Sequence, residues 1–297
     1  MTKAVFTTRV NPSYDDLPEV RYHFPKSYLN QVTAAVDDWI VYYEPRRHDS
    51  GPSARGGRQA YFATAFITGI REDSSLADHF YADVRDYLEF DRPVPFKEEE
   101  TYYENALRRE DGQTSKGAFG RAVRSLPEHE YETILASGFR ESLIGEPSRN
   151  DTGFAEPAAT FERPIIEQVV ARPFRDAAFA RAIREAYEST CAVTGLKLLN
   201  GGGRVEIEAA HIRPIGDGHM GPDSVRNGLA LSRTVHWMFD RGLVSISDDY
   251  RLLVSKAVPT DALHMFPPHR QIRLPDIPNL QPHKQFLRYH REHIYKD

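Results

Sequence analysis

Hydrophobic and polar positions along the first hundred residues follow the patterns expected of β-strands. The runs WIVYYEP (39–45), RQAYFATAFITGI (58–70) and FYADVRDYLEF (80–90) are rich in aromatic and β-branched side chains, which favour strands. The first two runs are separated by RRHDSGPSARGG, a polar stretch with glycines that is typical of a loop. The N-terminal part of the chain is therefore predicted to be β-rich.

Helical periodicity is stronger further along the chain. Residues 117–139 are predicted to be helical with a break at Leu126-Pro127, and residues 176–190 carry a stripe of apolar side chains at helical spacing. Residues 242–255 indicate a hairpin, and residues 283–295 indicate a closing helix. Between these regions, residues 141–164 hold three prolines, two glycines and many polar residues, which favours a linker. The prediction is an α+β chain with domains at 1–140 and 165–297, joined by the linker 141–164.

The second predicted domain contains a candidate site. The run VEIEAAHIRPI (205–215) reads as a strand that ends at His211, and NGLALSRTVHWMFDRG (227–242) begins as a loop or strand and continues as a helix. His236 and Asp240 are four residues apart, so both face one side of that helix, where an imidazole and a carboxylate suit a divalent cation. Trp237 and Phe239 on the same helix are expected in the core.

Taken alone, His211 has two interpretations. It could be a core histidine with a hydrogen-bond partner, or a base that accepts a proton from water. A strand that delivers His211 opposite the helix would place its imidazole beside the bound metal, and the joint pattern with His236 and Asp240 favours the base.

The stretch AAHIRPI…GPDSVRNGLALSRTVHWMFDRG resembles the HNH nucleases, over about residues 190–255. That resemblance implies a ββα-metal core in which His211 is the general base and Asn227 braces the loop that orients it. It also implies that His236 binds a divalent metal such as Mg²⁺ or Mn²⁺, with Asp240 as a second ligand from the helix.

Two positions depart from the pattern of many HNH proteins. Paired cysteines often hold a structural zinc there, but Cys191 is the one cysteine of this chain, so no structural zinc is predicted. Many members also carry an acid or histidine directly before the base, where this chain has Ala210. Glu208 shares a strand face with that position and is a candidate replacement ligand, with a solvated surface role as the alternative.

Composition and charge add moderate constraints. The net charge is −5, but residues 171–297 carry 18 basic and 14 acidic side chains, so the second predicted domain tolerates nucleic acid. Arg213, Arg226 and Arg233 are candidate phosphate-binding residues, although each could be an ordinary surface charge. A single cysteine, no apolar run of membrane-spanning length and no recognisable secretory signal favour a cytoplasmic protein.

The N-terminal part resembles domains found fused to HNH nucleases, and its strand-rich layout resembles the PUA superfamily of small barrels, which includes the SRA, YTH and EVE readers. That resemblance implies a pocket that holds a flipped, modified base. Aromatic residues are plentiful there, and although most are expected in the barrel core, Tyr43, Arg46 and Tyr61 are the candidates for the pocket.

These observations together predict a modification-dependent restriction endonuclease. Its expected substrate is double-stranded DNA with 5-methyl- or 5-hydroxymethylcytosine, and duplex cleavage by a single-site nuclease suggests a homodimer. Two alternatives stay open: an HNH nuclease of DNA or RNA without modified-base specificity, and a binding module whose HNH core has lost catalysis. The substitution at Ala210 is the feature that favours the last alternative.

Overall fold

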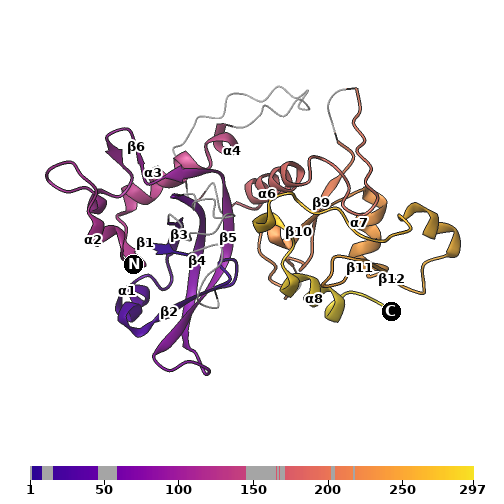
Figure 1. Ribbon diagram of the computed structural model, residues 1–297, viewed down its shortest axis with the longest axis horizontal. Helices are drawn as coiled ribbons and strands as arrows, with labels where there is room; N and C mark the ends of the chain where they lie inside the picture. The colour runs from indigo at the N-terminus through magenta and orange to yellow at the C-terminus, as the bar shows by residue number, and fades with distance from the viewer. Residues whose placement is uncertain are drawn as a thin grey trace, which may run out of the picture. The chain divides into compact units, whose positions relative to one another are not determined.

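The computed structural model describes residues 2–8, 16–45, 59–144, 165, 167, 171–201, 205–216 and 218–297. The chain forms two compact units, Met1–Arg175 and Asp176–Asp297 (Figure 1). The predicted loop at 46–57 and most of the predicted linker at 141–164 lie outside the described residues. Among the residues that are described, no helix is both long enough and apolar enough to span a membrane.

A six-stranded sheet forms the centre of the first unit, in the order β2-β5-β4-β3-β1-β8. β1 runs parallel to β3, and the other neighbours are antiparallel. Its strands are β1 (Ala4–Thr7), β2 (Arg21–Pro25), β3 (Trp39–Glu44), β4 (Ala60–Glu72), β5 (His79–Pro95) and β8 (Val123–Ser125). The three predicted runs are thus confirmed as β3, β4 and β5, whereas β8 falls within a stretch that was predicted to be helical.

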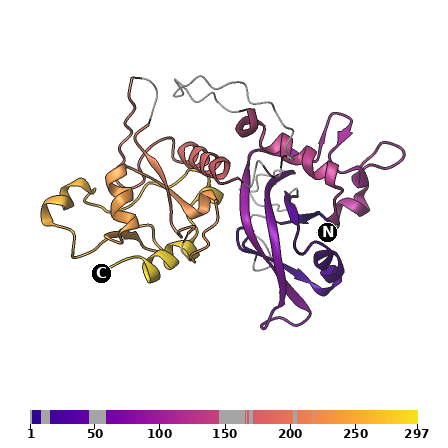
Figure 2. The same cartoon turned by 180° about the vertical axis from the view of Figure 1, so that it is seen from behind.

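The sheet curls because its longest strands contain irregularities. β4 and β5 pair with three register shifts and β3 and β4 with one, and extra residues at such bulges bend a sheet (Figures 1 and 2). Within the described residues, β2 and β8 form the two edges of this curled sheet and do not pair with each other. The closed PUA-like barrel of the sequence prediction is therefore not confirmed.

Both faces of the sheet are buried at its centre, which explains why β3 reads as a continuous apolar run. Ile40 and Tyr42 point into a core of aromatic and aliphatic side chains, where Tyr42 stacks on Phe62. On the sheet's other face, helix α3 (Glu128–Gly138) packs against β4 and β5, and its Tyr131 hydroxyl shares a hydrogen bond with Thr64. The described part of the first unit also contains short 3-10 helices at Lys26–Tyr28 and Asn105–Leu107 and the elements α1 (Leu29–Ala34), β6 (Lys97–Glu98), β7 (Thr101–Tyr102), α2 (Lys116–Phe119) and α4 (Arg140–Ile144).

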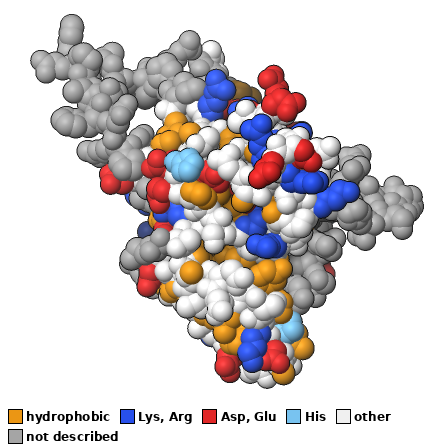
Figure 3. Space-filling view, turned by 90° about the vertical axis from the view of Figure 1, so that its left-hand side faces the viewer, with side chains coloured by type: hydrophobic (Ala, Val, Ile, Leu, Met, Phe, Trp, Pro, Cys, Tyr) orange, Lys and Arg blue, Asp and Glu red, His pale blue; other side chains and the backbone are white. Residues whose placement is uncertain are grey.

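The surface of the first unit carries charges of both signs. Figure 3 shows acidic and basic side chains interspersed over one of its faces.

The second unit is built around two antiparallel strands and a helix. β9 (Glu208–His211) pairs with β10 (Gly228–Leu231), and helix α7 (Arg233–Asp240) follows β10 after one residue. Gly242 ends this segment with a left-handed φ of 73°, as its sequence position predicted. The other elements are α6 (Arg172–Ala186), which begins in the first unit, β11 (Val244–Ile246), β12 (Leu252–Val254) and α8 (Lys284–His293).

Helix α6 packs closely on β10 at Gly228. A Cβ built on this glycine would lie 2.3 Å from Cδ1 of Ile183 and 2.8 Å from Cζ of Phe179. Only glycine allows this approach, and the approach brings α6 against the strand end that carries His211.

Candidate active site

His211 lies at the end of β9, opposite Gly228 of β10. Its Nε2 is 3.0 Å from Oδ1 of Asp223, whose side chain is completely buried. The ring of Phe179 stacks on the imidazole at 3.8 Å between centroids, with 14° between the planes. The imidazole is therefore fixed both in position and in orientation.

Asn227 braces the loop between the two strands. Its Oδ1 accepts a hydrogen bond from the backbone N–H of Arg213 at 2.8 Å. Its Nδ2 donates to the carbonyl oxygens of Arg213 and Pro222 at 3.0 and 2.9 Å. Because Asn227 is fully buried, its amide is shielded from bulk water and satisfies its hydrogen-bonding capacity through these backbone groups.

His236 and Asp240 lie on one face of α7, as the spacing of four predicted. Nε2 of His236 is 3.4 Å from Oδ2 of Asp240, while Nδ1 of His236 is 2.9 Å from Oε2 of Glu208. Partial burial raises the pKa of Asp240 above its ordinary value, and the nearby His236 and Arg241 act in the opposite sense. A partly buried carboxylate beside an imidazole nitrogen is an arrangement that a cation would stabilise.

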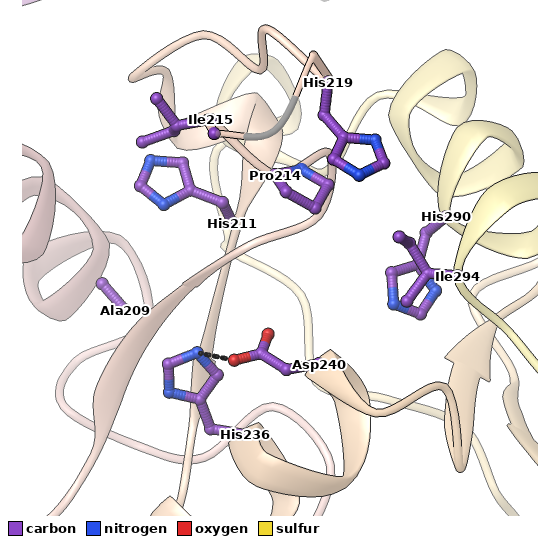
Figure 4. A pocket seen from close by; sticks show the side chains of 10 residues that line it. Ala209, His211, Pro214, Ile215, His219, His236, Asp240, His290 and Ile294 are labelled. Atoms are coloured by element: carbon purple, nitrogen blue, oxygen red, sulfur yellow. Dashed lines mark ion pairs between the residues drawn. The ribbon is translucent and has the colours of Figure 1, made fainter.

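These side chains meet at one cavity of about 450 Å³. Figure 4 shows His211, His236 and Asp240 around it, brought together from β9 and α7. Ala209 lines the cavity as well, whereas Ala210 is fully buried in the core. The remaining lining residues are Pro214, Ile215, Gly216, His219, His290 and Ile294.

The residues present fit a divalent cation held by few protein ligands. Adjacent ligands of an octahedral Mg²⁺ lie about 3 Å apart, close to the separation of the facing His236 and Asp240 atoms. In the part of the chain that the structure describes, no group of three or more His, Cys, Asp or Glu side chains surrounds one metal position. A divalent ion such as Mg²⁺ commonly keeps several waters and is bound by few protein ligands.

Glu208, the candidate replacement ligand, contacts the other ring nitrogen of His236, and metal binding by Glu208 stays a prediction. Its carboxylate lies against Nδ1 of His236, and its other oxygen is 3.0 Å from Nε of Arg233. A metal-binding histidine commonly donates the N–H of its second ring nitrogen to a carboxylate. This hydrogen bond fixes the tautomer and the orientation of the ring.

The three predicted phosphate-binding arginines have different surroundings. Arg233 is largely exposed and pairs with Glu208. Arg213 donates through Nε to the carbonyl of His219, and its guanidinium lies 4.5 Å from the ring centroid of Tyr289. Arg226 is half-buried. Phosphate binding by any of them stays a prediction.

The thiol of Cys191 connects two segments of the second unit. Sγ of buried Cys191 lies 3.4 Å from the backbone nitrogen of Thr194 and 3.3 Å from that of Ser232. These hydrogen bonds join the segment at Cys191 to the start of α7.

Two sequence expectations about α7 had different outcomes. Phe239 is buried, as expected. The expectation that Trp237 lies in the core is wrong, because 57% of this residue is exposed.

The candidates for a base pocket lie in the first unit. Tyr43 and Tyr61 are both buried and contact each other edge to face, with ring centroids 5.2 Å apart. The Tyr61 hydroxyl donates to Glu104, which also forms a buried ion pair with Arg124. Arg46 lies outside the described residues. The role of these three residues stays a prediction.

Sequence reasoning missed Asp223. It lies in the loop between the two strands, twelve residues after His211, and no spacing rule marks it. The one available signal was a carboxylate in the turn Pro222-Asp223-Ser224, which equally predicts an ordinary turn residue.

The second unit thus combines two antiparallel strands and the following helix, with one histidine from β9 and one from α7. Residues 191–247 match the family model described as HNH endonuclease. No curated protein matches the sequence.

Two solved structures are similar to the chain. The first, titled "Modification dependent TagI restriction endonuclease", has 14% sequence identity and a TM-score of 0.34, covering 98% of this chain and 82% of the other. The second is titled "Structure of the Type IV phosphorothioation-dependent restriction endonuclease ScoMcrA", with 14% identity, a TM-score of 0.21, and coverage of 97% and 56%.

Proposed function

We propose that this chain is a metal-dependent endonuclease that hydrolyses DNA phosphodiester bonds in its second unit. One observation supports this most directly: His211 and His236, which are 25 residues apart in sequence, line the same cavity together with Asp240. Their residue types supply a base and two metal ligands, which are the parts that phosphodiester hydrolysis requires.

His211 takes a proton from a water molecule as the water oxygen forms a bond to phosphorus. The bond between phosphorus and the leaving sugar oxygen breaks, and that oxygen takes up a proton from solvent. Asn227 keeps β9 and the following loop in register during this step, so the imidazole does not have to be reoriented.

His236 and Asp240 are the residues that would hold the cation. A bound divalent ion supplies stabilisation of the negative charge that develops on the phosphate. Glu208 directs His236 from the side opposite Asp240, and Arg213, Arg226 and Arg233 are the candidates for contacts with neighbouring phosphates.

The first unit is proposed to act as a PUA-like reader of a flipped modified cytosine, 5-methyl- or 5-hydroxymethylcytosine. Its support is the strand-rich, aromatic composition and the fusion to an HNH segment. Tyr43, Arg46 and Tyr61 remain the candidates for base contacts. The substrate is then double-stranded DNA, and cutting both strands requires two copies, which favours a homodimer.

A plasmid panel tests these proposals. The same plasmid is prepared unmodified, with 5-methylcytosine and with 5-hydroxymethylcytosine, and is digested with Mg²⁺ or Mn²⁺ present or removed by chelation. Cleavage that needs the metal and a modified cytosine supports both parts of the proposal. Equal cleavage of all three plasmids would contradict the reader role of the first unit but not the nuclease activity of the second unit. An RNA substrate tests the alternative of an RNA-cleaving nuclease.

A pair of histidine variants tests the catalytic assignment. His211→Ala is expected to lower cleavage by about two to four orders of magnitude, the range that general base catalysis contributes. His264→Ala, at an exposed position of the same unit, is the matched control and is expected to leave cleavage unchanged. A lack of metal-dependent cleavage in every substrate would instead favour a binding module without catalysis.

A further inference from the structure

The two ring nitrogens of His211 have different surroundings. Nε2 lies 3.0 Å from the buried Asp223 carboxylate, and no described residue forms a hydrogen bond with Nδ1. The His211 side chain is 16% exposed and lines the cavity that also holds His236 and Asp240.

We propose that Asp223 is a positioning residue of the active site: its carboxylate accepts the Nε2–H of His211, and the Nδ1 lone pair then takes the proton from water. This inference rests on the proposed nuclease function, because it specifies how the proposed base works. It assigns a role to a residue outside the histidine–asparagine–histidine pattern.

The physical reason is the limited hydrogen-bonding capacity of each group. A neutral imidazole has one donor and one acceptor nitrogen, while an ionised carboxylate only accepts. Asp223 therefore selects the form of His211 that is protonated on Nε2 and leaves Nδ1 as the acceptor. When Nδ1 takes a proton, the ring becomes positively charged beside a buried carboxylate, and this charge-assisted hydrogen bond stabilises it.

Two further side chains keep the imidazole and the carboxylate in register. Phe179 holds the plane of the imidazole by stacking on it. Asn227 binds the backbone of Arg213, two residues after His211, and the carbonyl of Pro222, directly before Asp223. Asn227 thus links the segment that carries His211 to the segment that carries Asp223.

The proton balance of the step is simple. One proton moves from water to Nδ1 of His211, and the water oxygen binds phosphorus. The bond to the leaving sugar oxygen breaks, and that oxygen takes a proton from solvent. The Nε2 proton stays in the hydrogen bond between His211 and Asp223 throughout.

Nuclear magnetic resonance of the full chain tests the pairing without any need for activity. In ¹⁵N-labelled protein, His211 is identified as the histidine signal lost in His211→Gln. We expect a protonated Nε2 whose proton is shifted downfield and protected from exchange with water, together with an unprotonated Nδ1. Asp223→Ala should abolish that protected proton, while Asp261→Asn, at an exposed position, should leave it intact. A His211 ring protonated on Nδ1 and bare on Nε2 would overturn the proposal.

Kinetics provide the second arm. Asp223→Asn, which keeps the side-chain shape and removes the charge, is expected to lower kcat about 10–100-fold with KM unchanged. In a His211→Ala background the same substitution should cause no further loss, since its target is gone. If Asp223→Asn lowers kcat further in the His211→Ala background, or changes KM alone, Asp223 has a general structural role instead.

The two arms separate this inference from the proposed function. If the chain cleaves no DNA but His211 shows the protected Nε2 proton, the nuclease proposal fails while the pairing is supported. If the chain cleaves DNA and His211 lacks the protected Nε2 proton, the nuclease proposal is supported and the pairing with Asp223 is contradicted.

Discussion

Replacing Asn227 with alanine tests the brace at the centre of the site. The substitution removes three hydrogen bonds and leaves the N–H and carbonyl of Arg213 and the carbonyl of Pro222 without their amide partner. A buried hydrogen bond contributes about 1 kcal/mol, and a buried group left unsatisfied costs about 1–3 kcal/mol. Asn227→Ala is therefore expected to lower the free energy of unfolding by about 3 kcal/mol or more.

The position of the two tryptophans makes this measurement specific to the second unit. Trp39 is in the first unit and Trp237 in the second, so a Trp39→Phe background leaves Trp237 as the one tryptophan reporter. Urea unfolding followed by its fluorescence gives the stability of that unit. Hydrogen exchange of the Arg213 amide, whose acceptor is lost in the variant, provides an independent readout and should become faster.

Two companion variants strengthen the test. Asn227→Asp keeps an acceptor for Arg213 but points a carboxylate at two carbonyl oxygens, so it should destabilise the unit at least as much as alanine. Asn105→Ala, at an exposed position in the first unit, should change neither readout. If Asn227→Ala unfolds within about 0.5 kcal/mol of its parent, the range of ordinary surface substitutions, the amide does not brace the loop.

Three further predictions concern the same unit. Burial lowers the pKa of His290 from 6.5 to about 4. Between these two pH values His290 is therefore protonated in the unfolded chain and neutral in the folded chain. The contribution of His290 to the free energy of unfolding is fully present above pH 6.5 and falls by about 3 kcal/mol as the pH drops to about 4. Urea unfolding at a series of pH values should show this slope, and His290→Gln should reduce it. Gly228→Ala places a methyl 2.3 Å from Ile183 and should lower the melting temperature, whereas Gly201→Ala, where nothing lies within 4 Å, should not. Glu208→Gln weakens the hold on His236 and should reduce Mn²⁺ affinity about 10-fold by calorimetry.

Each of these has an outcome that contradicts its physical reason. An unchanged pH slope in His290→Gln would assign the acid sensitivity to other groups. Equal melting temperatures for both glycine variants would show that α6 can move away from β10 without cost. Unaltered Mn²⁺ binding in Glu208→Gln would show that this carboxylate neither orients the metal-binding histidine nor binds the ion.

Local sequence determined the longest strands and the relative placement of two candidate site residues. The aromatic and β-branched runs define β3, β4 and β5, because strand preference depends largely on side chains within one segment. The spacing of His236 and Asp240 places both on one helix face through the helical repeat alone. The spacing of His236 and Asp240 could therefore be predicted without knowledge of any tertiary contact.

The tertiary structure decided what depends on partners distant in sequence. Strand β8 exists because it pairs with β1, more than a hundred residues earlier, and a three-residue run has little preference of its own. Trp237 is 57% exposed among the described residues, because α7 buries the face that carries Val235, Met238 and Phe239. The carboxylates of Asp223 and Glu208 acquire their partners only when the loop and α7 meet β9, since hydrogen bonding across a site depends on atomic positions and not on residue type.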